Sequence, residues 1–166
     1  MRQPLLLCAC LVLCAACGCG PPGGARAVGS SPPRPVETVD VVDLRAAPVA
    51  LNWDDQPGPD GVEAYVYLYQ QAHPLPVTVG GTLEFLLFEG KVPQGSVRTM
   101  NPFCIWPFAG QQLNRHLVRG VAGWMYVVRL PWGTNVPKTE MVTLAVRYHL
   151  PKGEPRYSSP VPIAMK

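Results

Sequence analysis

Apolar and polar residues alternate with a period of two in several short segments of this chain, and this pattern is typical of half-buried β-strands. The segment Val62–Tyr69 shows it first. One face of the predicted strand carries small and aliphatic side chains, namely Ala64, Val66 and Leu68. The opposite face carries three tyrosines, Tyr65, Tyr67 and Tyr69. Tyrosine favours half-buried strands, so packing accounts for this row, and the row is also the candidate binding face of the protein.

Two segments in the second half of the chain alternate in the same way. In residues 123–132 the positions that share one face are Trp124, Tyr126, Val128 and Leu130. In residues 140–151 the inward positions are Val142, Leu144, Val146, Tyr148 and Leu150, and the outward positions are Thr143, Ala145, Arg147 and His149. Both segments are therefore predicted to be strands that bury one face and expose the other.

Weaker patterns complete the set of predicted elements. Residues 36–48 are rich in β-branched residues and predict an edge strand, and residues 156–166 predict a short final strand whose prolines also mark an edge. A strand near 76–79, a Gly80-Gly81 turn and a strand over 82–88 predict a hairpin. One helix is predicted over Ala109–Gly120, where Leu113, Leu117 and Val118 form a narrow apolar stripe, after an aromatic loop over 101–108.

Composition agrees with a domain of short strands and rigid turns. The chain has 166 residues, of which 20 are proline and 16 are glycine, and only 15% are charged. About seven short strands separated by proline and glycine turns, with one short helix, predict an all-β fold. The arrangement resembles an immunoglobulin-like or transthyretin-like β-sandwich in architecture, and we place this domain at residues 36–166.

The N-terminus has a different character. After Arg2, residues 4–16 carry no charge, and this run of thirteen residues is shorter than the roughly 20 that a membrane-spanning helix needs. Its length fits the apolar region of an export signal. Residues 18–35 then contain five glycines and five prolines and predict a disordered linker, which cannot build a packed core.

The segment VLCAAC, residues 12–17, resembles the processing box of bacterial lipoproteins, in which small residues precede a cysteine. The resemblance covers residues 1–17 alone and implies nothing about the fold of the domain. It implies that residues 1–16 are a signal peptide cleaved after Ala16, and that Cys17 carries the lipid. Cys19, preceded by Ala16-Cys17-Gly18, is the competing attachment site. Gly18 stands where an Asp often signals inner-membrane retention in that family, which favours the periplasmic side of the outer membrane.

Two other interpretations of the N-terminal cysteines and signal stay open. Ala25-Arg26-Ala27 fits the recognition pattern of an ordinary signal peptidase, although it lies far beyond the apolar run. Cleavage there would release a secreted protein without a lipid anchor. Cys14 and Cys17 have the spacing of a redox motif, but the βαβ context of that motif is missing.

Charge is divided unevenly along the chain. Between Gly18 and Glu89 there are three basic and nine acidic residues, whereas from Gly90 onward there are ten basic and two acidic residues. A basic C-terminal half would attract anionic lipid or polysaccharide, but two halves that interleave in one sandwich neutralise each other. The formal net charge of +3 gives no indication of nucleic-acid binding.

Residues with chemical potential are scattered. His73, His116 and His149 lie far apart in sequence without metal-ligand spacing, and His149 is expected near Arg147 or Arg129 as ordinary surface charge. Cys104 lies among apolar neighbours and is expected to be a small buried residue. The acidic residues Asp54, Asp55 and Asp60 lack the spacing of an EF-hand and predict a solvated turn.

These observations predict no enzyme, no catalytic residue, no metal site and no cofactor. We expect a cell-envelope lipoprotein with a binding or structural role, held at a membrane by its lipid and facing an envelope protein or polysaccharide. The alternative is a secreted β-sandwich that binds a small ligand between its sheets. A hydrolase is the weakest hypothesis, and it would need a pocket that gathers a histidine and an acidic residue.

Overall fold

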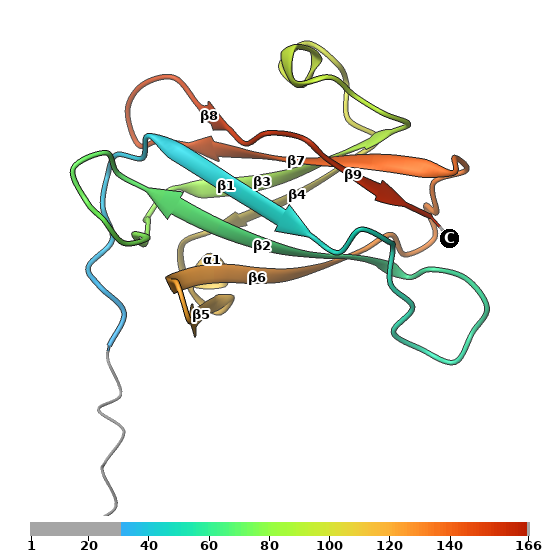
Figure 1. Ribbon diagram of the computed structural model, residues 1–166, viewed down its shortest axis with the longest axis horizontal. Helices are drawn as coiled ribbons and strands as arrows, with labels where there is room; N and C mark the ends of the chain where they lie inside the picture. The colour runs from blue at the N-terminus through green and yellow to red at the C-terminus, as the bar shows by residue number, and fades with distance from the viewer. Residues whose placement is uncertain (1–30, 166) are drawn as a thin grey trace, which may run out of the picture. The chain divides into compact units, whose positions relative to one another are not determined.

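The computed structural model describes residues 31–165, which form two β-sheets packed against each other (Figure 1). The compact unit begins at Pro32. All pairings between its named strands are antiparallel.

The first sheet has four strands in the order β1-β2-β6-β5. These strands are β1 (Val41–Ala46), β2 (Gly61–Tyr69), β6 (Gly123–Pro131) and β5 (Leu117–Gly120). The second sheet has the order β4-β3-β7-β8, and β9 also pairs with β7. Its strands are β4 (Cys104–Ala109), β3 (Thr82–Glu89), β7 (Met141–His149), β8 (Arg156–Tyr157) and β9 (Val161–Ala164).

Two short helical segments accompany the sheets. They are the 3-10 turn η1 (Gln94–Ser96) and the helix α1 (Gly110–Asn114). The predicted all-β sandwich is therefore confirmed, and residues 31–165 contain nine strands rather than about seven. Two additional strands, β4 and β5, come from segments in which the sequence predicted a loop and a helix, and the predicted final strand is divided into β8 and β9.

The core between the sheets is built from the inward faces of the predicted strands. Its members, each no more than 1% exposed, include Ala64, Val66, Leu68, Tyr126, Val128 and Leu130 from the first sheet and Leu83, Phe85, Leu87, Val142, Leu144, Val146 and Tyr148 from the second. The alternation predicted for β2, β6 and β7 is thus confirmed on its inward side. Burial of each large apolar side chain contributes about 1.5–3 kcal/mol, so this layer dominates the stability of the domain.

The chain that follows β1 crosses from one sheet to the other. The Ala50 N–H donates to the Ala164 carbonyl at 2.8 Å, and the Ala164 N–H donates to the Pro48 carbonyl at 2.9 Å. β1 belongs to the first sheet and Ala164 to β9 of the second, so backbone hydrogen bonds join the two sheets along this side. On the other side α1 connects the edge strands β4 and β5.

The predicted helix over Ala109–Gly120 is wrong beyond its first turn. Helix α1 ends at Asn114, and Leu117–Gly120 is instead β5, which pairs with the first four residues of β6. Leu113 is buried in the core, but Leu117 and Val118 lie on opposite faces of β5, and Val118 is 45% exposed. Three apolar residues make a weak helical signal, and pairing with a long neighbouring strand overrides it.

Two other local predictions are corrected by long-range contacts. Residues 76–79 form no strand, and Val79 is held by a single bridge to Val36 and by its N–H, which donates to the Tyr126 hydroxyl at 3.0 Å. The aromatic segment over 101–108 contains the edge strand β4 rather than a loop throughout. In β4, Pro107 lies opposite Glu84 and has no N–H to donate.

Part of the outward face of β7 is covered. Thr143 and Ala145, predicted to face solvent, are 1% and 0% exposed. The chain between β3 and β4 folds over them, so that Val92 and Val97 pack with Ala145 and with outward residues of β3, which are Leu86 and Phe88. The second sheet is therefore buried on both faces over part of its area.

We predict that Gly81 tolerates no side chain, because a Cβ atom there would lie 2.4 Å from the His149 carbonyl oxygen and 2.7 Å from the Tyr148 ring. Gly81→Ala should lower the free energy of unfolding by about 1–3 kcal/mol through overpacking, measured by urea denaturation of the purified protein. Gly80→Ala is the matched control, because nothing lies within 4 Å of its Cβ position. Equal stabilities of the two variants would contradict the prediction.

Candidate functional site

The three predicted tyrosines lie in a row on the outer face of β2, half-buried between β1 and β6. Across the ladders, Tyr65 lies opposite both Arg45 and Val127. Tyr67 lies opposite Asp43 and Tyr69 opposite Val41 on β1. The surface made by these side chains together with Glu63 and Arg129 is called here the tyrosine face.

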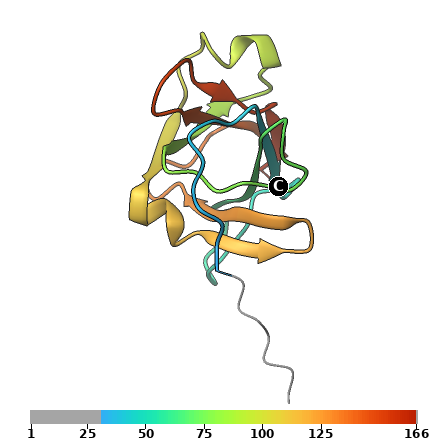
Figure 2. The same ribbon diagram turned by 90° about the vertical axis from the view of Figure 1, so that its left-hand side faces the viewer.

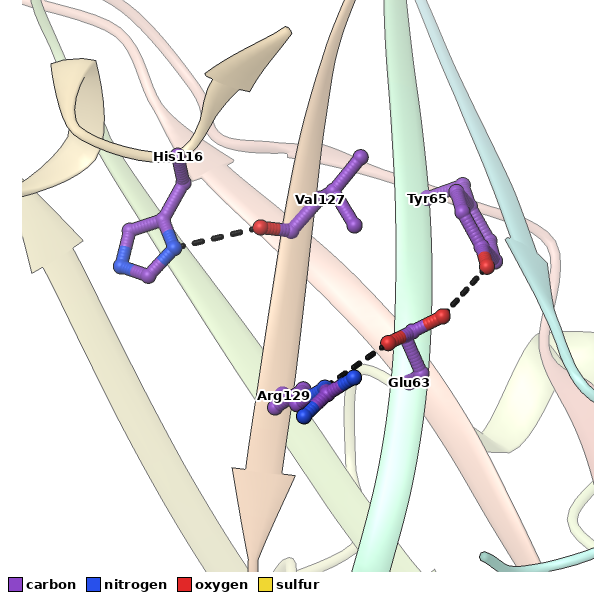
Figure 3. A network of polar contacts seen from close by, with 5 residues as sticks. All are labelled: Glu63, Tyr65, His116, Val127 and Arg129. Carbon is purple, nitrogen blue, oxygen red and sulfur yellow. Dashed lines mark hydrogen bonds and ion pairs between the residues drawn. The ribbon is translucent and has the colours of Figure 1, made fainter.

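An acidic residue organises one end of the tyrosine face (Figure 3). The Tyr65 hydroxyl donates to one carboxylate oxygen of Glu63, and the Arg129 Nε–H donates to the other at 3.0 Å. These two hydrogen bonds, that of Tyr65 first, hold the pKa of Glu63 below its ordinary value of 4.5. The bond to Glu63 in turn raises the pKa of Tyr65, so at neutral pH the phenol stays protonated and the carboxylate charged.

A second ion pair occupies the other part of the face. The Arg45 guanidinium donates twice to the Asp43 carboxylate, at 3.2 and 3.1 Å, and lies 5.3 Å from the centre of the Tyr67 ring. The Tyr67 and Tyr69 rings stack with their centroids 6.5 Å apart at an angle of 20°. Partial burial raises the pKa of Tyr69. The charges of the face are therefore paired within the face itself.

Apolar side chains border the tyrosines. Val41 on β1 is 54% exposed, Val118 on β5 is 45% exposed, and Met125 and Val127 on β6 are half-buried. Val118 and Met125 are paired across the β5–β6 ladder. The outer surface of the first sheet thus combines aromatic and aliphatic groups with ion pairs that are already neutralised.

His116 supports this surface from the side. It lies in the turn after α1 rather than on a longer helix, and its Nδ1 is 3.2 Å from the Val127 carbonyl (Figure 3). The Val127 N–H donates to the His116 carbonyl at 2.9 Å, and the imidazole packs against the Phe108 ring. His116 therefore fixes the backbone beside Tyr65, which is a structural role.

His149 and Arg147 do come together, but around a carboxylate that the sequence did not indicate. Glu84 on β3 lies 2.6 Å from Arg147 and 2.7 Å from His149, whereas Arg129 belongs to the other sheet. Burial raises the pKa of Glu84, but the hydrogen bonds from His149 and Arg147 outweigh it and the net shift is downward. An internal carboxylate thus occupies the position that an external anion would take.

The remaining sequence candidates have local partners. The ring of His73 contacts the Leu75 carbonyl of its own loop. The Asp60 carboxylate accepts hydrogen bonds from the N–H groups of Trp53 and Asp54, so this acidic loop is closed by its own backbone. Cys104 is half-buried on β4, and burial raises the pKa of its thiol. Within residues 31–165 no three His, Cys, Asp or Glu side chains gather into a metal site.

A cavity of about 380 Å³ lies at the N-terminal end of the domain, outside the space between the sheets. Its lining consists of Pro32, Pro33, Arg34, Pro35, Thr78, Asn114 and Leu117. The space between the sheets, where a small ligand was considered, is filled by the core side chains. The pair formed by His149 and Glu84 lies on the second sheet and contributes nothing to this cavity.

The signal peptide, the cleavage position after Ala16 and the two candidate lipid sites Cys17 and Cys19 lie outside the described residues. Among residues 31–165, none of the helices has the length and apolar character required to cross a bilayer. Comparison of the chain with protein-family models, curated proteins and solved structures gives no significant match.

We predict that the pKa of Glu63 depends on Tyr65. Tyr65→Phe removes the hydrogen bond that lowers it most, so the pKa of Glu63 should rise toward 4.5 in a titration followed by NMR of the carboxyl carbon. Tyr67→Phe is the control and should leave this pKa unchanged.

The depressed pKa of Glu63 also makes stability depend on pH. The stability that Glu63 contributes is present above the pKa that this carboxyl has in the unfolded chain, and it is lost as pH falls through the pKa in the folded chain. The acid destabilisation of Tyr65→Phe should therefore be smaller than that of the wild type, and identical pH profiles would count against the assignment.

Proposed function

We propose that this protein is a lipoprotein of the bacterial cell envelope whose sandwich domain binds another envelope protein through the tyrosine face. The observation that carries the proposal is the row of half-buried tyrosines on β2 between ion pairs neutralised within the surface. The domain acts as a binding module and performs no catalysis. Its lipid, attached at Cys17, keeps it on the periplasmic side of the outer membrane.

The composition of the tyrosine face supports a protein as the partner. The cores of protein interfaces are enriched in tyrosine, tryptophan and arginine, and lysine, glutamate and aspartate are depleted there. Glu63 and Asp43 already have cationic partners, so a partner would not have to compensate either carboxylate when it excludes water from the surface. Tyr67 stacks on Tyr69, and the Arg45 guanidinium lies over the Tyr67 ring. These contacts hold the side chains in place before binding, so less conformational entropy is lost on association.

A protein partner is favoured over a polysaccharide by the way the rings are arranged. Arg45 lies over the Tyr67 ring, and Tyr67 stacks on Tyr69, so these aromatic faces are engaged within the molecule. The ring of Trp53 is likewise stacked, under Arg129 at 5.5 Å. A sugar ring needs a free aromatic face on which to stack, whereas a protein side chain packs equally well on ring edges and aliphatic groups.

The lipid attachment predicts a specific labelling result. A palmitate analogue supplied to the native host should label the wild type and Cys19→Ala but not Cys17→Ala, because the first two keep the acylated sulfur. Labelling of Cys17→Ala at the wild-type level, together with its loss in Cys19→Ala, would move the attachment to Cys19. An intact mass that corresponds to a chain starting at Val28 would instead establish cleavage by the ordinary signal peptidase.

The binding face predicts a position-specific cross-link. A photoreactive phenylalanine analogue at position 67 in the full-length chain should form a discrete protein adduct in the intact envelope. The same residue at position 157 is the control, because Tyr157 is a half-buried tyrosine on the outer face of the second sheet. Adding Arg45→Ala to the position 67 probe should reduce the adduct, since it removes the stacked cation. Equal adducts at both positions, or none at position 67, would exclude the tyrosine face as the binding surface.

A further inference from the structure

The turn between β5 and β6 is apolar and projects from the domain. Its sequence is Gly120-Val121-Ala122-Gly123, and Val121 is fully exposed. Trp124, the residue after the turn, is half-buried and lies opposite Arg119 on β5. A fully exposed valine beside a tryptophan is uncommon on a water-facing surface, where tight turns are usually polar.

The loop between β2 and β3 extends this apolar surface. Leu75 in this loop is 57% exposed, and the neighbouring Pro76 lies so close to Gly123 that a Cβ atom on that glycine would be 2.8 Å from the proline ring. The loop and the β5–β6 turn therefore pack against each other. Val121 and Leu75 are the most exposed large apolar side chains among the described residues.

The chain enters the domain at this same end. The Thr78 hydroxyl donates to the Pro33 carbonyl at 2.9 Å, and the Val36 N–H donates to the Thr78 carbonyl at 2.8 Å. Thr78 is buried, so these bonds fix the entering segment to the body of the domain. Figure 2 looks directly at this end and shows the entering segment, the β2–β3 loop, α1 and the β5–β6 turn together.

Cationic side chains lie at the same end of the domain, around the cavity at the start of β5. Arg34 lines the cavity together with Asn114 and Leu117, and the exposed Arg115 follows Asn114 in the chain. Two acidic residues also lie near the entering segment, Glu37, which is exposed, and Asp40, which accepts a hydrogen bond from the Gln71 N–H at 2.7 Å. Arginine near an apolar tip is suited to lipid phosphate, while tryptophan favours the boundary between headgroups and acyl chains.

We propose that this end of the domain, formed by the β5–β6 turn and the β2–β3 loop, rests on the phospholipid surface of the bilayer that holds the anchor. Val121 and Leu75 enter the interfacial layer, Trp124 lies at the headgroup level, and Arg34 and Arg115 face lipid phosphates. The inference extends the proposed function, because the lipid anchor would bring this end to the membrane. The contact orients the sandwich so that the tyrosine face, on the side of the first sheet, is presented laterally to a partner.

The experiment measures the depth of Trp124. The mature chain is isolated from the host and combined with phosphatidylethanolamine–phosphatidylglycerol vesicles whose acyl chains carry bromine near the headgroup, a quencher of nearby tryptophan fluorescence. Quenching should be strong in the wild type and largely lost in Trp124→Phe, which keeps the aromatic packing. Val121→Asp should weaken binding to the vesicles by about tenfold or more, because a charge replaces the valine that enters the lipid layer. Val136→Asp is the matched control, since Val136 is 44% exposed in the β6–β7 loop.

Two results would overturn the proposal. One is quenching that persists unchanged in Trp124→Phe, and the other is equal quenching in Val121→Asp and Val136→Asp. Failure of the lipid anchor is separable, because palmitate labelling reports on Cys17 and Cys19 and not on this end of the domain. If the mature chain proves to be unacylated, the same quenching comparison on the freely added chain still decides whether this end contacts the bilayer.

Discussion

The pairing of β3 with β7 is the interaction on which the rest of the structure depends. Its register runs without interruption from Thr82 opposite His149 to Glu89 opposite Val142. β4 is added to one side of this pair, and β8 and β9 are added to the other. One face of the pair carries the main core, and part of the other is covered by the chain between β3 and β4. The ion cluster of Glu84, Arg147 and His149 lies across the same two strands. It links β3 to β7 where their outer face is not covered, and it is not an independent site.

The first sheet is organised differently, and this difference creates the candidate site. Its inner face completes the core, whereas its outer face is covered at the Gly61 end by Trp53 of the β1–β2 loop, which lies under Arg129. The half-buried tyrosines are bordered by one another, by their charged neighbours, and by Val41 and Val127 on the adjacent strands. The carboxylates of Asp43 and Glu63 each have an arginine partner. These ion pairs make the surface polar without giving it a strong charge of either sign.

Alternation along single strands was predictable, because it depends only on the period of two within a segment. It identified the inward faces of β2, β6 and β7, and it placed the tyrosines together on one side. It could also have identified Glu63, which has the same parity as Tyr65 in β2. The partners of these residues were not predictable, since the pairing of Glu63 with Arg129, and of Glu84 with Arg147, depends on register between strands more than sixty residues apart.

The errors have a common physical origin in contacts that are distant in sequence. Leu117 and Val118 suggested a helical stripe, but the ladder with β6 assigns them to a strand. Thr143 and Ala145 have the parity of exposed residues and are nevertheless buried, because parity determines the face of a strand and not what covers that face. Residues 76–79 resembled a strand by composition, yet their hydrogen bonds go separately to Leu68 on β2, to Tyr126 and to the entering segment.

Pro107 has a consequence for the membrane anchoring that we propose. Molecules confined to a bilayer collide in two dimensions, with their sides turned toward one another, so exposed strand edges meet far more often than in solution. β4 is such an edge, and a second copy could extend the sheet only by using its row of free N–H and C=O groups. The proline ring interrupts that row in the middle of the strand, and the opposite edge of the first sheet, β5, is only four residues long. Under the proposed anchoring, β4 therefore offers no uninterrupted row on which a second copy could extend the second sheet.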